Sequence, residues 1–431
     1  MPFLPAVLLL VLLGSLAAVS AQNLTESQLA NVVARLADGA THPWELGTRA
    51  QAILEHDVRP FSVFSLSLPE TSVPSNTSSA ISPVFSIAKT VLSNRATSNK
   101  NITGPQPLVS DDSAADPASI GPAVLLANWT GRGQSDGVDY AGAAQDQFNF
   151  LYFRVPKTSD GAISHRTSEL QLWSDFVYMV PPFLAYYGLL TNNQSLLEDA
   201  YTQIKLYRNY LRDTQSNNLW KHIQLGTGSG GSQVANDDGH WSTGNAWAAA
   251  GMLRVLASIS TSSFSSSMSS EQDDLSSWIF EIQSGMYPHI DSSSSLFHNY
   301  ADNTATFLDA ASTALLASTV YRLSLLRSIH HFLPAAEQSR KALFGTNSSG
   351  DLTHFTSDGW LTPVVNPDNF GAEGTTSPEG QAFVLDLQAA WEDWVQDGSK
   401  GANGASRIRG GPSGAYLMVL FTFMGVWVMF I

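Results

Sequence analysis

The sequence predicts an all-α protein. Many apolar segments of ten to twenty residues are joined by polar loops of variable length, and the strict alternation typical of strands is scarce. The chain has 431 residues, of which 43% are hydrophobic, and this is enough to bury a large core. Helices joined in this way pack as stacked hairpins. No exact internal repeat is present, so periodicity alone does not predict a closed ring of hairpins.

Apolar residues at three- and four-residue spacing predict the individual helices. The best-marked one covers residues 169–180, where Ser168 is expected to cap the first turn and Gln171 to complete a capping box. Pro181-Pro182 should bend or interrupt this helix. In the last helix, Ser377 is placed to cap and Pro378 takes the first position. The other predicted helices span residues 28–36, 143–153, 196–211, 246–258, 305–326, 335–344 and 380–394.

Polar segments divide the chain around one expected domain, residues 22–396. Within it, residues 71–117 are rich in Ser, Thr, Asn and Pro and have little helical period, which predicts a decorated loop or a poorly ordered low-complexity insertion. The polar runs 258–276 and 292–295 are predicted to be surface loops. Residues 397–414 are rich in Gly and Ser and are predicted to form a linker.

Both ends of the sequence are apolar. Residues 1–21 have the form of a signal peptide, with Val19-Ser20-Ala21 as the cleavage signal, although the missing basic residue near Met1 leaves an uncleaved anchor as an alternative. The uncharged residues 415–431 follow a polar spacer and the small residues that begin at Asn403, which predicts a glycosylphosphatidylinositol anchor attached there. A single transmembrane helix is the alternative for this tail.

Either alternative places the domain outside the cell, on the outer face of the plasma membrane or in the cell wall. The glycosylation sequons agree with this location; they lie at Asn23, Asn76, Asn101, Asn128, Asn193 and Asn347. The chain has no cysteine, so stability must come from packing. A net charge of −15 argues against nucleic acid as a partner. It also means that an anionic substrate would require a local cation.

Three short segments combine aromatic, acidic and imidazole side chains. They are Gly161–Arg166 together with Trp173–Met179, then Leu219–His222, then Gly239–Trp247. Tryptophan beside Asp, Asn and His is typical of a sugar site, because flat rings stack on pyranose faces while polar groups bind hydroxyls. The sequence therefore predicts a carbohydrate-binding site.

These segments resemble the unsaturated rhamnogalacturonyl hydrolases and the related unsaturated glucuronyl hydrolases, of glycoside hydrolase families 105 and 88. Trp173-Ser-Asp175, three residues and Met179 resemble the helix that carries the family's catalytic acid and base. The resemblance covers roughly residues 130–394 and implies an (α/α)6 barrel of six helical hairpins, with Asp175 as the catalytic residue. It implies substrate contacts from His165, Arg166, Trp173, His222, Trp241, Thr243, Asn245 and Trp247.

The sequence departs from the family pattern at two places. The family's arginine in the third segment is Thr243 here, and Arg166 could replace its charge. The family's second carboxylate should lie upstream of residue 140, where Asp136 and Asp139 are the candidates.

The resemblance implies hydration of the C4–C5 double bond of a terminal uronic residue, such as those derived from rhamnogalacturonan or pectin, by a monomer that needs no cofactor. Asp175 would give and take the proton if burial raises its pKa. No metal is expected, because the spacing from Asp237 to His240 matches no ligand pattern. Two alternatives are an inverting glycosidase with a second carboxylate at about 6.5–9.5 Å, and a non-catalytic carbohydrate-binding cell-wall protein.

Overall fold

The computed structural model describes residues 23–65, 79–98, 104–227 and 235–402. The predicted signal peptide and the hydrophobic tail lie outside these residues, as do Asn76, Asn101 and Asn403. Among the helices that are described, none combines the length and the apolar character needed to cross a membrane.

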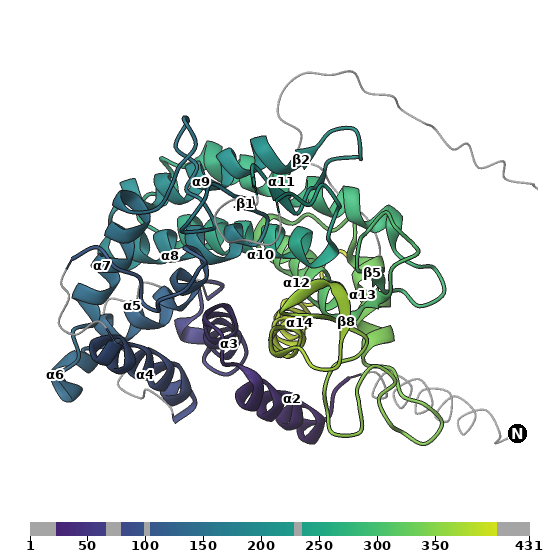
Figure 1. Cartoon of the computed structure of the whole chain (residues 1–431). Coiled ribbons are helices and arrows are strands. Elements are labelled where there is room, and N and C mark those ends of the chain that lie inside the picture. Colours follow the sequence, from purple (N-terminus) through teal and green to yellow (C-terminus); the bar gives the residue numbers. More distant parts are fainter. Residues whose placement is uncertain (1–22, 66–78, 99–103, 228–234, 403–431) are drawn as a thin grey trace, which may run out of the picture.

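The major helices of the described ranges form two rings and alternate between them along the chain (Figure 1). The inner ring contains α3 (Pro43–His56), α5 (Gly121–Trp129), α8 (Phe176–Thr191), α10 (Ser242–Thr261), α12 (Ala310–Arg327) and α14 (Pro378–Gln396). The outer ring contains α2 (Glu26–Gly39), α4 (Ser82–Ser98), α7 (Tyr140–Phe153), α9 (Gln194–Leu211), α11 (Ser269–Met286) and α13 (Leu333–Leu343).

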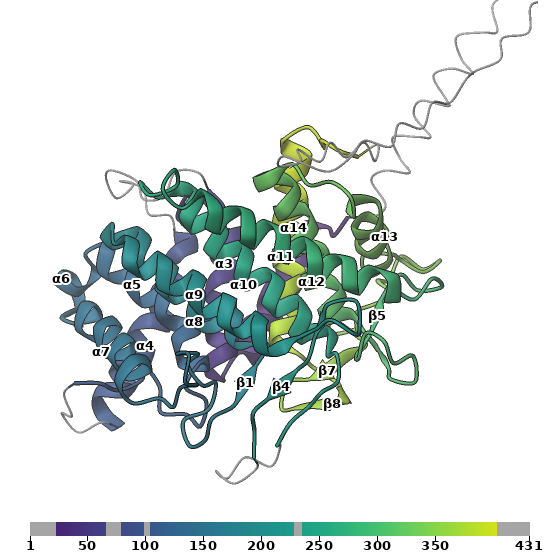
Figure 2. The ribbon, with the colours of Figure 1, turned by 90° about the horizontal axis from the view of Figure 1, so that it is seen from above.

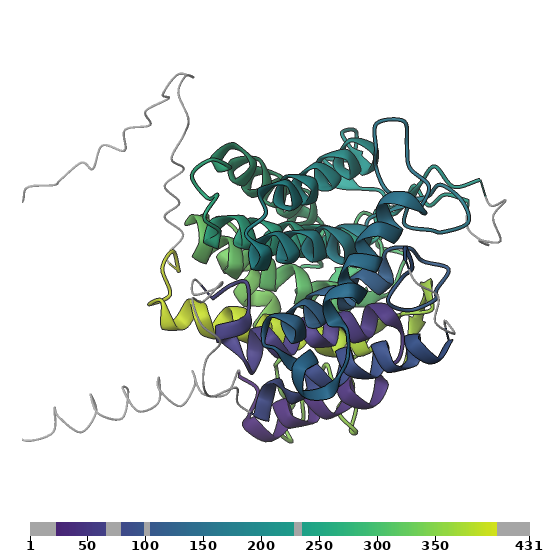
Figure 3. The same cartoon turned by 90° about the vertical axis from the view of Figure 1, so that its left-hand side faces the viewer.

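The inner ring is closed. Each inner helix packs against the next, and α14 packs against both α12 and α3, so the first and last inner helices lie side by side (Figure 3). Each outer helix covers an inner one: α2 lies on α14, α4 and α7 on α5, α9 on α8, α11 on α10, and α13 on α12. The predicted (α/α)6 barrel of six hairpins is therefore confirmed.

The inner helices differ from the outer ones because they are buried around most of their circumference. A helix that is apolar or small on all sides belongs in a core, and small residues allow close packing between neighbours. Gly251 on α10 is one such position, because a Cβ there would lie 2.1 Å from the carbonyl oxygen of Val177 on α8. Any larger residue would force these two helices apart.

The short strands and several loops gather at the end of the barrel where the inner helices begin (Figure 2). Here β1 (Leu172–Trp173) pairs with β4 (Ile223–Gln224), and β7 (Val364–Asn366) pairs with β8 (Asn369–Gly374). Two further pairs join β2 (Arg212–Asp213) to β3 (Leu219–Trp220) and β5 (Phe297–His298) to β6 (Leu308–Asp309). The minor helices are α6 (Arg132–Asp136), η1 (Arg59–Phe61), η2 (Ser79–Ile81), η3 (Asp116–Ile120) and η4 (Tyr287–His289).

The prediction of a loop or insertion over residues 71–117 was wrong for residues 82–98, which form α4. Polar residues hide the helical period of α4, but Val84, Ile87, Ala88 and Val91 recur at helical spacing and are buried. The loop predicted for residues 258–276 was also wrong, since α10 continues to Thr261 and α11 begins at Ser269. The helices α3 and α5 were not predicted from the sequence, whereas the bounds of α9 and α14 match their predictions closely.

The helix predicted for residues 169–180 begins later than expected, at Phe176. Ser168 caps nothing, and tertiary hydrogen bonds hold the preceding segment extended: the His165 N–H donates to the Gln171 carbonyl at 2.7 Å, and the Ser174 N–H to the His222 carbonyl at 2.9 Å. Pro181-Pro182 do not interrupt α8, which continues to Thr191. Asp175 consequently lies just before an inner helix rather than in the middle of one.

Candidate functional site

Asp175 occupies the position that precedes α8, at the strand-bearing end of the barrel. Its side chain is 15% exposed, and its Oδ1 accepts a hydrogen bond of 3.0 Å from the Ser174 hydroxyl. Burial raises the pKa of the Asp175 carboxyl, although His222 and the bond from Ser174 oppose this change. A carboxyl group in this state can hold a proton at a pH where an exposed aspartate would have lost it.

His222 lies beside Asp175 and follows β3. Its Nε2 is 4.0 Å from the Asp175 Oδ1, and its Nδ1 is 2.9 Å from the Asp237 Oδ2. Two aromatic rings pack on the imidazole, with centroid distances of 4.5 Å to Trp241 and 4.4 Å to Phe370. The structure therefore brings the predicted residues Asp175, His222 and Trp241 together.

Trp173 forms the other side of the cluster. Its indole stacks on the imidazole of His165, with centroids 4.9 Å apart, and meets His222 edge-on at 5.3 Å. The guanidinium of Arg166 lies 5.8 Å from the Trp173 ring. Burial, followed by the charge of Arg166 and the charge that His222 carries when protonated, lowers the pKa of His165 well below its usual value, so this imidazole is neutral. Arg166 thus supplies a positive charge at the edge of the aromatic cluster.

Asp116 is a site residue that the sequence analysis missed. It begins η3, directly before the inner helix α5, and its Oδ1 lies 3.7 Å from the His165 Nε2. Burial, together with repulsion from Asp111 and Asp175, raises the pKa of Asp116 to about 8. Asp116 and Asp175 each precede an inner helix, and this shared placement brings both carboxyl groups to the same end of the barrel.

Asp136 and Asp139, which were proposed as the second carboxylate, have other roles. Asp136 accepts a hydrogen bond from the Tyr140 hydroxyl at 2.8 Å. Asp139 caps α7 by accepting from the Gly142 N–H, also at 2.8 Å. Both lie outside the cluster around Asp175, so this assignment was wrong. Asp116 escaped notice because it falls in the stretch that was interpreted as a loop.

Three residues predicted to contact substrate are instead buried in the supporting structure. The hydroxyl of Thr243 donates to Asp309 at 2.8 Å. The amide of Asn245 accepts from the Trp220 N–H and donates to the carbonyls of Trp220 and Trp241. Trp247 packs edge-on against Tyr178 and Phe383. These side chains hold the segments that carry His222 and Trp241, and the polar groups of Thr243 and Asn245 are occupied by hydrogen bonds within the protein.

The assembled cluster has two carboxyl groups of raised pKa, a neutral imidazole, an arginine and indole rings. Such a cluster can stack against a sugar ring and supply a proton to it. The described residues contain no group of three or more His, Cys, Asp or Glu side chains arranged to hold a metal ion.

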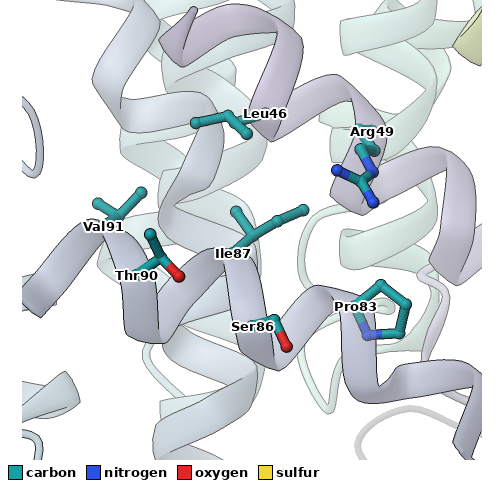
Figure 4. Close-up of a pocket in the computed structure, with 7 residues that line it drawn as sticks. All are labelled: Leu46, Arg49, Pro83, Ser86, Ile87, Thr90 and Val91. Atoms are coloured by element: carbon teal, nitrogen blue, oxygen red, sulfur yellow. The ribbon is translucent and has the colours of Figure 1, made fainter. Parts of the chain in front are cut away.

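A groove of about 400 Å³ lies elsewhere, between α3 and α4 (Figure 4). The guanidinium of Arg49 is at one end of it, and the other lining side chains are mainly apolar. None of the residues of the Asp175 cluster lines this groove, so it is a separate feature of the surface.

Comparisons with known proteins agree with this architecture. The structure resembles a solved protein described as a possible member of the GH105 family from Salmonella enterica serovar Paratyphi A, with TM-score 0.59 and 16% identity over 85% of this chain and 93% of the other. It also resembles a family 88 glycosyl hydrolase from Bacteroides vulgatus, with TM-score 0.54 and 13% identity over 86% of this chain and all of the other. An unsaturated glucuronyl hydrolase specific for heparin gives TM-score 0.55 and 13% identity, over 86% and 97% of the two chains.

At these identities the structural likeness establishes the fold. The comparison with curated proteins gives no match. The family itself is shown by sequence, because the model for Glycosyl Hydrolase Family 88 matches residues 85–359, which is more than half of the chain. The matched region includes Asp116, Asp175 and His222. The chain therefore belongs to glycosyl hydrolase family 88, and it is a glycoside hydrolase built on a barrel of six helical hairpins.

Proposed function

We propose that this hydrolase adds water across the C4–C5 double bond of a terminal unsaturated uronyl residue, with pectin-derived oligosaccharides as the substrate class. The observation that carries the proposal is the largely buried Asp175 carboxyl, whose pKa is raised and which lies beside His222, the imidazole that contacts Trp173 and Trp241. An indole can stack on the flat unsaturated ring while the carboxyl group faces its edge.

The reaction requires one group to act first as an acid and then as a base. Protonated Asp175 gives its proton to C4, and a positive charge develops at C5 and the ring oxygen. Water then attacks C5 while the Asp175 carboxylate takes the proton from that water, which restores the starting state. The product is a hemiketal at C5, which opens and releases the remaining saccharide. A pKa near the working pH favours both steps.

Asp116 and Arg166 have supporting roles in this proposal. Protonated Asp116, with its pKa of about 8, can donate a hydrogen bond to a sugar hydroxyl. Arg166 can bind the uronate carboxylate, because its Nε is buried without a partner and its ion pair with the exposed Asp112 is long, at 3.8 Å. This arginine would supply the local cation that an acidic protein needs for an anionic substrate.

The test uses oligosaccharides produced from pectin by a polysaccharide lyase, because their conjugated double bond absorbs ultraviolet light. The wild-type enzyme should remove this absorbance, and Asp175→Asn should abolish the activity. Circular dichroism should show that the variant keeps the wild-type fold. Asp139→Asn is the matched control, since Asp139 is an exposed helix cap. Unchanged absorbance with every unsaturated uronide, pectin-derived or otherwise, would contradict the proposal.

An inverting glycosidase is a second candidate, because Asp116 provides a second carboxyl group near Asp175. An inverting enzyme needs one of the two as an ionised base, but both carboxyl groups have raised pKa values, which disfavours this reaction. Release of an inverted sugar from a saturated glycoside, followed by NMR, would support this candidate. No reaction with saturated glycosides would leave hydration as the better account.

We further propose that the enzyme acts at the cell surface, held by a glycosylphosphatidylinositol anchor. Support comes from the sequence: residues 1–21 have the form of a signal peptide, and the apolar residues 415–431 follow a polar spacer. Phosphatidylinositol-specific phospholipase C should release the enzyme from intact cells. Retention after this treatment, with extraction only by detergent, would indicate a transmembrane helix instead.

A further inference from the structure

Asp237 lies behind His222, on the side away from Asp175. Its Oδ2 is 2.9 Å from the His222 Nδ1 and 2.6 Å from the Tyr300 hydroxyl oxygen. Its other oxygen, Oδ1, accepts a hydrogen bond of 3.0 Å from the Gly239 N–H. This carboxyl group therefore accepts hydrogen bonds from the Gly239 N–H and the Tyr300 hydroxyl, and from the His222 Nδ1 when that nitrogen carries a hydrogen.

These contacts determine where the proton of His222 must be. Burial alone would raise the pKa of Asp237, but the hydrogen bonds from His222, Tyr300 and Gly239 outweigh it and lower the pKa. Asp237 is thus an ionised carboxylate and can only accept hydrogen bonds. The His222 Nδ1 must then carry a hydrogen, and in the neutral imidazole the Nε2 has a free lone pair.

The free Nε2 faces the proposed catalytic acid. It is buried, has no hydrogen-bond partner among the described residues, and lies 4.0 Å from the Asp175 Oδ1. We infer that Asp237, supported by Tyr300, is a positioning residue that keeps His222 in the Nδ1–H tautomer, with Nε2 as an acceptor directed at Asp175.

The tautomer matters because the two forms act on Asp175 in opposite ways. In the neutral imidazole, an Nε2 lone pair disfavours a negative charge on the neighbouring carboxylate and so helps Asp175 to keep its proton, whereas a protonated His222 lowers the pKa of Asp175. An Nε2–H would instead donate to that carboxylate and stabilise its charged form, so that less of Asp175 holds the proton it must give at the working pH. The titratable groups that act on His222 are Asp175 and Asp237, with His165 beyond them. The kinetic consequence rests on the proposed function, whereas the tautomer itself does not.

Asp237→Asn should reverse the tautomer without a change of shape. The Gly239 N–H requires an acceptor at the Oδ1 position, so the amide oxygen should occupy it. The amide nitrogen then takes the place of Oδ2 and donates to the His222 Nδ1, which moves the imidazole hydrogen to Nε2. Tyr300→Phe is a milder second variant, since it removes one support and leaves the Asp237–His222 bond in place.

The chain offers a matched control. His240 also has its Nδ1 bound to an aspartate, at 2.7 Å from the Asp302 Oδ2, but its Nε2 faces Asp213 at 3.5 Å rather than Asp175. Asp302→Asn therefore makes the same chemical change at a neighbouring histidine–aspartate pair and should leave both His222 and the activity unchanged.

The experiment is ¹⁵N NMR of the folded enzyme labelled at histidine, with the His222 signals assigned by their loss in His222→Gln. We expect Nδ1–H and an unprotonated Nε2 in the wild type and in Asp302→Asn, and Nε2–H in Asp237→Asn. Uronide turnover should fall about 10- to 100-fold in Asp237→Asn, the range found when the partner behind a metal-bound histidine is removed. The alkaline limb of its kcat/KM profile should move to lower pH.

The inference is overturned if wild-type His222 carries its hydrogen on Nε2, or if Asp237→Asn changes neither the tautomer nor the pH profile. If Asp237→Asn does not fold, the wild type and Tyr300→Phe decide: because the Asp237–His222 bond remains, both should show the Nδ1–H signal and the same alkaline limb, and an Nε2–H in either protein overturns the inference. If no unsaturated uronide reacts, the proposed function fails, while the NMR result still tests the tautomer.

Discussion

The imidazole of His165 and the indole of Trp173 are nearly parallel, with an angle of 11° between their planes and 4.9 Å between their centroids. The Trp173 Nε1 donates to the Gln171 side chain at 2.8 Å, which fixes the indole from the other direction. The Trp173 indole therefore has a fixed orientation before substrate binds. Arg166 directly follows His165, so this stack also places the guanidinium at the edge of the site.

Arg166→Gln should weaken the binding of uronides that carry a free carboxylate. A charge-assisted hydrogen bond contributes about 1.5–3 kcal/mol, so KM should rise roughly 10- to 150-fold. Steady-state kinetics with an acidic substrate and its methyl ester separate charge from shape, because the ester should be affected much less. An equal loss for both substrates would contradict a role in carboxylate binding.

Asn245→Ala should destabilise the fold rather than act on substrate affinity. The three hydrogen bonds of this amide go to the backbone of Trp220 and Trp241, and each buried group left unpaired costs about 1–3 kcal/mol. Urea unfolding measures the loss. A normal unfolding midpoint with a raised KM would restore the substrate-binding role that the sequence analysis gave to Asn245.

The segment around Asn245 shows how far sequence alone can go. Tryptophan beside asparagine occurs both in sugar sites and in well-packed cores, so Trp241 and Trp247 look equivalent in the sequence. Trp241 packs on the His222 ring, whereas Trp247 packs on Tyr178 and Phe383. The two roles differ because Trp241 directly precedes α10 whereas Trp247 lies within it, and only the structure shows which ring packs on His222.

The catalytic role of Asp175 stays a prediction, and the local structure predicted for this residue was wrong. Its helix was expected to begin at a capping box formed by Ser168 and Gln171, which is a local signal. The backbone bond from Ser174 to His222 joins segments 48 residues apart and holds the chain extended. Long-range hydrogen bonds of this kind override local helix propensity. A pattern of neighbouring residues in the sequence does not reveal them.

Asp116 was missed for a different reason. It lies upstream of residues 130–394, where the sequence motifs resemble the family, and in a stretch whose Ser, Thr and Pro content indicated a loop. The usable signal was Asp116-Pro117 followed by the small and apolar residues of α5. That pattern marks the start of a buried helix, and the inner helices of this barrel begin at the site.

Asp116→Asn should remove a pH dependence of stability. The folded-state pKa of Asp116 is about 8, above the ordinary value, so the folded chain binds a proton that the unfolded chain has lost. The contribution of this group to stability is fully present below pH 4 or so and is lost as pH rises toward 8, with a slope of at most about 1.4 kcal/mol per pH unit. The Tm of the variant relative to wild type should therefore increase from pH 4 to pH 8. Asp139→Asn is the control, and a pH-independent difference for Asp116→Asn would contradict the assignment.

Arg254→Met should destabilise the barrel more than any exposed ion-pair variant. Arg254 on α10 is 3% exposed, and its Nη2 lies 2.5 Å from Glu55 on α3 and 3.4 Å from Asp386 on α14. Its removal breaks two buried ion pairs and leaves Glu55 with Arg322 alone, at 3.5 Å, which costs about 3–5 kcal/mol. Arg327→Met breaks the exposed pair with Asp273 and should cost less than about 1 kcal/mol.

Chemical denaturation of the two variants under identical conditions measures this difference. Because Arg254 joins helices from three different hairpins, its loss should lower the unfolding midpoint of the whole barrel in a single transition. Equal midpoints for the two variants would mean that the buried network contributes no more than a surface pair. In that case apolar packing and the remaining ion pairs, such as those of Arg322 with Glu55 and Asp393, would be enough to close the ring.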